Sequence, residues 1–398
     1  MSIPVANRIA DVDALRGFAL LGILLVNITA FSSVFYGLDI ADPNFDSPAD
    51  RTARFLITAL FEMKFYLLFS FLFGYSFTLQ MRSAECAGEG FTPRLLRRQI
   101  GLWLIGLLHA VFLYHGDILT TYAVLGIVLL LLRQSDTRLL LRVAVWLVVT
   151  TAAVWALVGL LLTLDATPVD RVAIEQQAQA AMQAYGGTPF TVIAQHMHEL
   201  SSMWLVLMLV QAPSALAMFL IGFVAGKKTL LARPSEHSAL LQRLVVAGLC
   251  VGLPGALLYA YTSVFAVGTP WAILGLAISL LTAPLLTGGY VAALVGFFAS
   301  PLGGTLRNLL APTGRMALSN YVAQSLACSV IFHAYGLRLV GQISPWSTIL
   351  IAIAIFAIQL LISRWWIGRF NYGPVEWLLR ALTIGAWPTW RRPLTVLR

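Results

Sequence analysis

Two histidines and an aspartate that lie close together in the sequence are the residues best suited to acid–base chemistry. They are His109 and the turn His115-Gly116-Asp117. A carboxylate beside an imidazole orients it and stabilises its charged form, as general-base catalysis requires. We predict a base supplied by His109, or by His115 with Asp117. Two structural roles stay open: a histidine that bonds a backbone carbonyl, and an Asp117 that caps a helix.

A second polar stripe runs from Asp13 and Arg16 to Asn27. Asp13 and Arg16 are three residues apart and can pair on one helix face. Arg16 and Asn27 are eleven residues apart, about three helical turns or roughly 16 Å along the axis. The stripe predicts a binding path into the protein. The alternatives are an interfacial arginine and an asparagine that bonds a neighbouring helix.

Further candidate binding residues lie near the C-terminus. Asn320 and Gln324 are four residues apart on one face, with Tyr321 beside them and Arg315 just before. This set predicts either a polar cavity lining or bonds to neighbouring helices. Glu376 follows Pro374 and suits the first turn of a short helix. The tryptophans and arginines around it indicate an amphipathic anchor at the membrane interface.

The composition places these polar groups in a membrane. Of the 398 residues, 59% are hydrophobic and 11% charged, and the mean hydropathy is +0.83. Soluble domains carry about 25% charged residues, so a soluble enzyme, a disordered chain and a disulfide-stapled module are excluded. The net charge of +9 reflects loop charges that orient membrane helices, and no nucleic-acid partner is predicted.

The fold class predicted is all-α, a polytopic membrane protein with about ten spans of about 20 residues. The predicted spans are 14–36, 55–81, 97–115, 118–132, 139–164, 201–225, 240–264, 270–298, 316–335 and 347–367. Of the 26 lysines and arginines, 21 then fall on one side and four on the other. The positive-inside rule places both termini in the cytoplasm. The second span is long for one crossing. As an alternative, the part from Arg51 to Met63 would lie along the outer interface, and the crossing would start at Lys64.

Three regions are predicted along the chain: an N-terminal bundle (1–165), an outer loop (166–200) and a C-terminal transmembrane region with an amphipathic tail (201–398). The loop is expected to hold a surface helix from Val169 to Gly187, ended by glycine. His196 and His198 are expected at the outer surface. The three cysteines are far apart and no familiar metal motif is present, so no metal site is predicted. A homo-oligomer is compatible with the sequence.

Several motifs, in order, resemble the YeiB family of bacterial membrane proteins over nearly the whole chain. They are Arg8 to Asn27 with its Asp13-Ala-Leu-Arg16-Gly core, Phe69-Ser-Phe-Leu-Phe-Gly74, Gly106-Leu-Leu-His109, Gly116-Asp117-Ile-Leu, Gly314-Arg315-Met-Ala-Leu-Ser-Asn320-Tyr321 and Gly373-Pro374-Val-Glu376-Trp377. The last two resemble that family's C-terminal domain of unknown function. The resemblance implies a multi-pass protein of the bacterial inner membrane.

The resemblance also implies a relation to a superfamily of transmembrane acyltransferases, which includes heparan-α-glucosaminide N-acetyltransferase and the O-antigen acetylases. Those enzymes move an acyl group from cytoplasmic acyl-CoA to a sugar on the outer side. The acetylases carry an arginine and a catalytic histidine at the spacing of Arg16 and Asn27. The glucosaminide enzyme has asparagine there and a histidine in the next outer loop, but residues 28–54 contain no histidine. Neither base carries over.

Two functions are therefore expected. The first is acyl transfer, with acyl-CoA as co-substrate, a sugar or lipid acceptor, and His109 or His115–Asp117 as base. The phosphates of acyl-CoA would meet Arg16 and Arg315. The thioester of acyl-CoA would lie near Asn27, Asn320 and Gln324, where Asn27 donates a hydrogen bond to the oxyanion. The alternative is a transporter or a lipid-binding protein on the same scaffold. The sequence shows no internal repeat and no sign of broken helices, which argues against that alternative.

Overall fold

The computed structural model describes residues 9–392 except 39, 87, 89 and 165–169, and these residues form helices and loops without a strand. The helices of the first half are α1 (Ala10–Ser32), α2 (Pro48–Leu60), α3 (Lys64–Cys86), α4 (Phe91–Phe112), α5 (Leu119–Leu132), α6 (Thr137–Leu164), α7 (Arg171–Gly186) and α8 (Pro189–Val206). Those of the second half are α9 (Ala212–Lys227), α10 (Ser238–Ala247), α11 (Leu253–Phe265), α12 (Pro270–Phe298), α13 (Pro301–Arg315), α14 (Ala317–Phe332), α15 (Pro345–Arg369) and α16 (Pro374–Ile384). A 3-10 turn (Pro234–His237) and two π-helical segments (Leu207–Gln211 and Gly248–Gly252) adjoin α10, α9 and α11.

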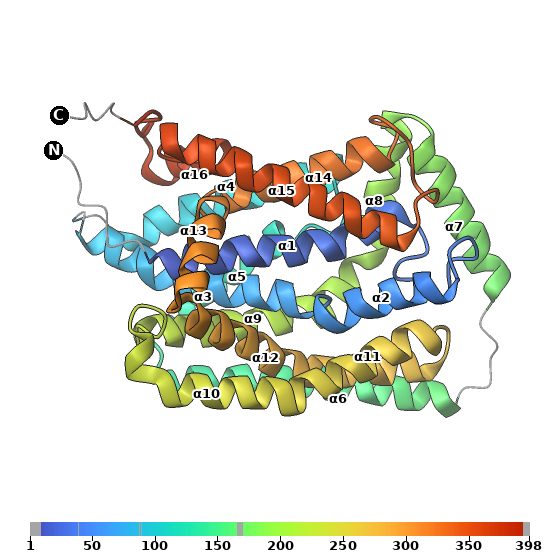
Figure 1. Ribbon diagram of the computed structural model, residues 1–398, viewed down its shortest axis with the longest axis horizontal. Helices are drawn as coiled ribbons and strands as arrows, with labels where there is room; N and C mark the ends of the chain where they lie inside the picture. Colours follow the sequence, from blue (N-terminus) through green and yellow to red (C-terminus); the bar gives the residue numbers. More distant parts are fainter. Residues whose placement is uncertain (1–8, 39, 87, 89, 165–169, 393–398) are drawn as a thin grey trace.

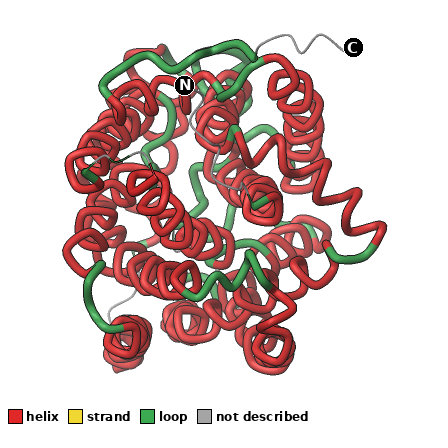
Figure 2. The backbone as a smooth tube through the Cα atoms, turned by 90° about the vertical axis from the view of Figure 1, so that its left-hand side faces the viewer, coloured by secondary structure: helices red, strands yellow, loops and turns green. Residues whose placement is uncertain are grey.

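Most helices run along one common axis, as expected for membrane spans (Figure 1). Figure 2 looks along this bundle and shows many of the helices end-on. The central helix α1 packs against α3, α13, α14 and α15. In Figure 1, α1 begins at one end of the bundle, and α7 lies at the opposite end. On the predicted orientation, the first end faces the cytoplasm.

The all-α membrane fold is confirmed. Among the described residues, eight helical stretches are long and apolar enough to cross a membrane, and two shorter apolar helices accompany them. The shorter pair, α5 and α14, corresponds to two of the predicted spans. Pro284 lies within α12, which continues through it. The α7 helix begins at the Asp170 cap and ends at Gly187, in agreement with the predicted surface helix; Val169 lies outside the described residues.

The long second span is broken, which corrects the expectation that broken helices are absent. Between α2 and α3 the backbone turns at Met63, whose φ is +66°, a value that non-glycine residues rarely adopt. Lys64 begins α3, as in the alternative considered for this span, and it is fully buried. Its ammonium donates to the Thr58 carbonyl oxygen at 2.8 Å. The α2 helix packs along α11, and Figure 1 shows it running in nearly the same direction as α3.

The amphipathic helix α13 was not predicted from the sequence. It begins at the Ser300 cap, whose hydroxyl accepts from the Gly303 N–H at 3.1 Å, and it ends at Arg315. It packs along the start of α1, where a Cβ at Gly314 would collide with the Asp13 carbonyl group. Arg315 therefore ends α13, whereas the sequence analysis placed it near the start of the next span.

Candidate functional site

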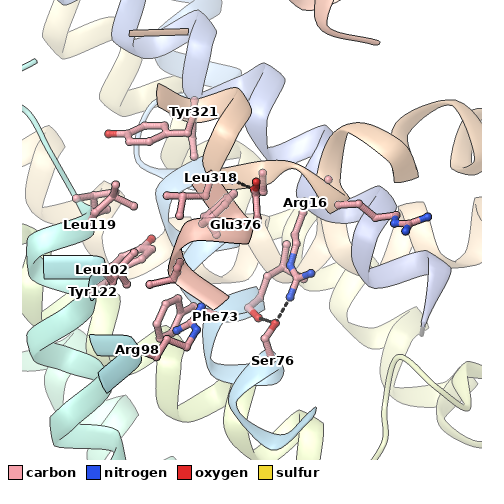
Figure 3. Close-up of a pocket in the computed structure, with 18 of the residues that line it drawn as sticks. Arg16, Phe73, Ser76, Arg98, Leu102, Leu119, Tyr122, Leu318, Tyr321 and Glu376 are labelled. Carbon is pink, nitrogen blue, oxygen red and sulfur yellow. Dashed lines mark hydrogen bonds between the residues drawn. The ribbon is translucent and has the colours of Figure 1, made fainter. Parts of the chain in front are cut away.

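A cavity of about 180 Å³ opens between α1, α3, α4, α5, α14 and α16 and the end of α13 (Figure 3). Its inner lining is mainly apolar and includes Ile23, Phe69, Leu102, Leu119 and Tyr321. On α1, α3 and α4, the apolar lining residues Ile23, Phe69 and Leu102 lie farther from the end of the bundle where α1 begins than the polar lining residues of the same helices, which are Arg16, Ser76, Gln80 and Arg98. The cavity therefore runs from a polar mouth into an apolar interior.

Arginines line the mouth of this cavity. Arg16 donates to Asp13 at 3.0 Å and to the Ser76 hydroxyl at 2.5 Å, as Figure 3 shows for Ser76. Arg98 lies over the Phe73 ring at 5.3 Å, and Arg315 lines the same mouth from α13. The predicted Asp13–Arg16 pair is thus present, and Arg315 is brought beside it.

A second cavity of about 220 Å³ adjoins the first, since the two share Gln80, Arg98, Glu376 and Leu379. Arg94 and Arg380 line it. Together the two cavities have five lining arginines and one lining carboxylate, Glu376. Planar guanidinium groups at such a density are typical of sites that bind phosphate or carboxylate groups.

The Glu376 carboxylate accepts hydrogen bonds from the first turn of α14. Its Oε1 accepts from the backbone N–H groups of Leu318 and Ser319 at 2.7 and 3.1 Å, and its Oε2 accepts from the Ser319 hydroxyl at 2.5 Å. A carboxylate at a helix N-terminus satisfies N–H groups that have no partner within the helix. Burial raises the pKa of this carboxyl, while the hydrogen bonds from Ser319 and Leu318 oppose that rise. Glu376 therefore joins α16 to α14 at the cavity wall.

His109 and Asp117 form a buried pair beyond the inner end of the first cavity. His109 Nδ1 lies 2.9 Å from Asp117 Oδ1, and both side chains are 1% exposed. The second carboxylate oxygen of Asp117 accepts from the Thr120 N–H at 2.8 Å. Asp117 therefore holds the histidine and also caps α5, so both roles considered for it are present.

The close approach of α4 to the start of α5 depends on Gly106, one turn before His109. A Cβ at this position would lie 2.7 Å from the Thr120 nitrogen and 2.9 Å from Asp117 Oδ2. These distances are shorter than ordinary van der Waals contacts with carbon. A glycine is required there because the backbone of α4 contacts the residues that hold Asp117.

The other ring nitrogen of His109 bonds a serine that the sequence analysis did not single out. His109 Nε2 lies 2.8 Å from the Ser325 hydroxyl oxygen. Ser325 lies one turn after Tyr321 on α14, and the Tyr321 ring centroid is 4.8 Å from that of His109. Because Tyr321 also lines the cavity, the His109–Ser325 pair lies next to a residue of the cavity wall.

His115 does not share Asp117 with His109. Its Nδ1 lies 2.6 Å from Glu199 Oε2 on α8, and the Tyr185 hydroxyl of α7 donates to the same oxygen at 2.6 Å. Burial by itself raises the pKa of Glu199, but hydrogen bonds with His115, Gln195 and Tyr185 lower it to about 2. The described residues therefore include two separate histidine–carboxylate pairs.

Two further histidines, His196 and His333, lie beside this outer pair. His196 is buried, which contradicts its expected place on the surface. Its ring lies 5.9 Å from that of His115 and 5.7 Å from that of His333. Burial, and next the repulsion from His115, lower the pKa of His196 to about 4. Within the described residues, no group of histidine, cysteine and acidic side chains has the arrangement needed to hold a metal ion.

Three predicted site residues lie elsewhere. The Asn320 amide donates to the Thr313 carbonyl oxygen at 3.0 Å and to the Ser363 hydroxyl at 2.9 Å. Gln324 donates to Gln359 at 2.9 Å, so both residues tie α14 to its neighbours. Asn27 is partly exposed on α1 and is not among the described residues that line the two cavities.

Comparisons with known proteins agree with the motif resemblance. Residues 225–386 match the model of a protein family described as "Protein of unknown function (DUF418)". Uncharacterized protein YxaH of Bacillus subtilis (strain 168) is 35% identical to the chain, with 96% of this chain and 95% of YxaH aligned. Uncharacterized protein YeiB of Escherichia coli (strain K12) is 27% identical, with 96% of this chain and 97% of YeiB aligned.

Proposed function

The chain belongs to the YeiB family, and from that premise we propose that it is a membrane acyltransferase, located in a bacterial inner membrane. It would transfer an acyl group from cytoplasmic acyl-CoA to a hydroxyl or amine of a sugar or lipid on the outer side. One observation carries the proposal: an arginine-lined cavity ends at the wall behind which the His109–Asp117 pair is buried.

The charge and lining of the cavity suit the donor. Acyl-CoA is an anion with several phosphate groups, and arginine binds phosphate through two parallel N–H groups. Arg16, Arg98 and Arg315 would hold these phosphates at the mouth. The apolar interior would take the pantetheine arm and the acyl chain, because its lining is mainly aliphatic and aromatic.

His109 is the base in this proposal. Asp117 accepts from Nδ1–H and leaves Nε2 with a lone pair, which is the tautomer that removes a proton from a hydroxyl. His109 lies eleven residues from Arg98 on α4, about 16 Å along the helix axis. The distance between the base and the phosphate site therefore suits the length of the pantetheine arm. His115 and Glu199 would lie on the acceptor's path, at the end of the bundle that carries α7.

The alternative is a transporter or lipid-binding protein, and the α2–α3 break favours it. Discontinuous helices in membranes frequently form transport sites, and here the break brings Glu62 near the buried Lys64. The Tyr259 hydroxyl donates to Glu62 at 2.9 Å. The arginine-lined cavity does not include these residues, so the two functions depend on different parts of the molecule.

Binding of acetyl-CoA and palmitoyl-CoA to the detergent-purified protein tests the donor site. We expect saturable binding that Arg16→Ala weakens by about tenfold or more, since a charged hydrogen bond contributes about 1.5–3 kcal/mol. Arg138→Ala is the matched control, because Arg138 is exposed and lies on the same predicted side. A folded wild-type protein that binds neither compound would overturn the acyltransferase proposal. Binding that Arg16→Ala leaves unchanged would place the donor elsewhere.

A further inference from the structure

We propose that Ser325 is the nucleophile of this site and carries the acyl group as an ester between donor and acceptor. The inference rests on the proposed function for its substrate, but its geometry stands by itself. Asp117, His109 and Ser325 form one hydrogen-bonded chain, with 2.9 Å between Asp117 Oδ1 and Nδ1 and 2.8 Å between Nε2 and Ser325 Oγ. This order of carboxylate, imidazole and hydroxyl activates serine on several unrelated folds.

The hydrogen-bond directions are fixed by the chemistry of the groups. A carboxylate accepts hydrogen bonds, so Asp117 accepts from Nδ1–H, and in this tautomer Nε2 is left as an acceptor. The Ser325 hydroxyl must then donate to Nε2. Asp117 itself is held by the Thr120 N–H. Each member of the chain is therefore oriented for proton transfer from serine to histidine.

The behaviour of other helical hydroxyls shows that this bond is not the default. Serine and threonine within helices commonly donate to the carbonyl one turn earlier. Ser70, Thr151 and Thr282 do so here. Within the described part of the chain, the hydrogen bond of the Ser325 hydroxyl is with His109. Its proton is directed at the base rather than at its own helix.

The position of Ser325 relative to the cavity indicates how a donor reaches it. Tyr321 lines the cavity one turn earlier on α14 and stands against His109. Ser325 is 2% exposed. The thioester of a bound donor would therefore meet Ser325 once the Tyr321 ring moves aside. Tyr321 is thus a positioning residue that controls access to the nucleophile.

The reaction balances in two steps. Ser325 Oγ attacks the thioester carbonyl while its proton moves to His109 Nε2; the carbon–sulfur bond breaks, and that proton leaves with the thiol. The acceptor hydroxyl or amine then attacks the acyl-serine ester as His109 takes its proton. The carbon–oxygen bond to Ser325 breaks, and the proton returns to the serine oxygen. A covalent intermediate lets donor and acceptor bind in turn from opposite sides.

A fluorophosphonate probe tests the nucleophile without any assumption about the substrate, because it phosphonylates activated serines. We expect wild-type protein to be labelled at Ser325, located by peptide mass spectrometry, and His109→Ala to lose at least about 90% of that label. Ser329→Ala is the matched control: Ser329 is buried one turn farther on α14, and its hydroxyl donates to the Leu113 carbonyl oxygen at 2.9 Å. Tyr321→Ala should label faster, since access widens.

Incubation with palmitoyl-CoA then separates this inference from the proposed function. A palmitoyl mass on the peptide that contains Ser325, absent in Ser325→Ala, supports both. If the probe labels Ser325 but no acyl adduct forms, the claim that Ser325 is activated stands, and the claim that acyl-CoA is the donor is wrong. Turnover that Ser325→Ala keeps and His109→Ala loses would overturn the serine and retain acyl transfer. If the probe labels neither the folded wild-type protein nor the Tyr321→Ala variant, Ser325 is not an activated nucleophile and the inference is wrong.

Discussion

Two histidine–carboxylate pairs lie in successive layers beyond the cavity, and they differ in what surrounds them. His109 and Asp117 are each 1% exposed and face Ser325. The side chains of His115 and Glu199 are 15% and 19% exposed and share a tyrosine hydroxyl. The residue types and distances are similar, but the inner pair adjoins the apolar cavity, since His109 lies against Tyr321 of its lining. Burial, and a serine hydroxyl on the second ring nitrogen of the histidine, therefore distinguish a candidate catalytic pair from a pair that holds outer helices together.

Removing each histidine is the strongest way to break this comparison. We expect His109→Ala to lower acyl-transfer turnover by about 10³-fold, within the range of general acid–base catalysis. His115→Ala should cost less than about tenfold, because a single hydrogen bond contributes about 0.5–1.5 kcal/mol. Turnover of purified protein in lipid nanodiscs measures both. A larger loss in His115→Ala than in His109→Ala would reverse the roles of the pairs.

Low pH should lower the folding stability of the protein through two groups beside His115, which are the buried His196 and the partly buried Glu199. His196 has a pKa of about 4 in the fold against about 6.5 when unfolded, so the unfolded state binds more protons between these values. Stability then falls as the pH drops through that window, by about 3 kcal/mol at about 1.4 kcal/mol per pKa unit. Glu199 adds to the loss below its unfolded pKa of about 4.5.

Thermal unfolding of the purified protein at pH 7, 6 and 5 checks this expectation. His196→Asn should flatten the dependence of Tm on pH, whereas His198→Asn should leave it as in wild type, because His198 is exposed two residues farther on the same helix. Equal pH dependence in wild type and His196→Asn would contradict the assignment of the acid sensitivity to the buried histidine.

A smaller effect is expected from Gly106→Ala, which sharpens the claim that the inner pair needs close helix packing. The added methyl group must displace Thr120 or Asp117, and overpacking of this kind costs about 1–3 kcal/mol. Both Tm and probe labelling of Ser325 should decrease. Gly296→Ala is the control, since a Cβ there meets nothing within 4 Å. An unchanged Tm and unchanged labelling in Gly106→Ala would show that α5 tolerates the displacement.

The sequence predicted much of the framework, because long apolar runs and turn residues are local signals. The membrane helices, the start of α3 at Lys64, the surface helix and the hairpin at Gly116 are examples. The α13 helix was missed although Ser300-Pro301 is a helix-start signal, since its apolar residues are too few for a span. Its packing on α1 gives Arg315 its place at the cavity mouth.

The site was harder to predict because its partners come from distant helices. His109 and Asp117 were identified, but spacing alone did not decide which histidine the carboxylate would bind. Ser325 is 216 residues from His109 in sequence, and Glu199 approaches His115 from α8. Neither contact can be predicted from the hydrophobic periodicity of a single helix. His196 was misplaced because two histidines in a polar loop resemble a solvated surface, whereas α8 packs back against α4.

The cap that Glu376 places on α14 has a consequence for biogenesis. The nascent chain emerges with α1 to α15 before α16 exists, so the first turn of α14 enters the membrane with its N–H groups unsatisfied by this carboxylate. The wall of the cavity is then completed only when α16 docks. A polypeptide shortened before Glu376 would insert its spans yet carry an α14 without this cap, and cellular quality control would meet a protein that is assembled except at the mouth of the cavity.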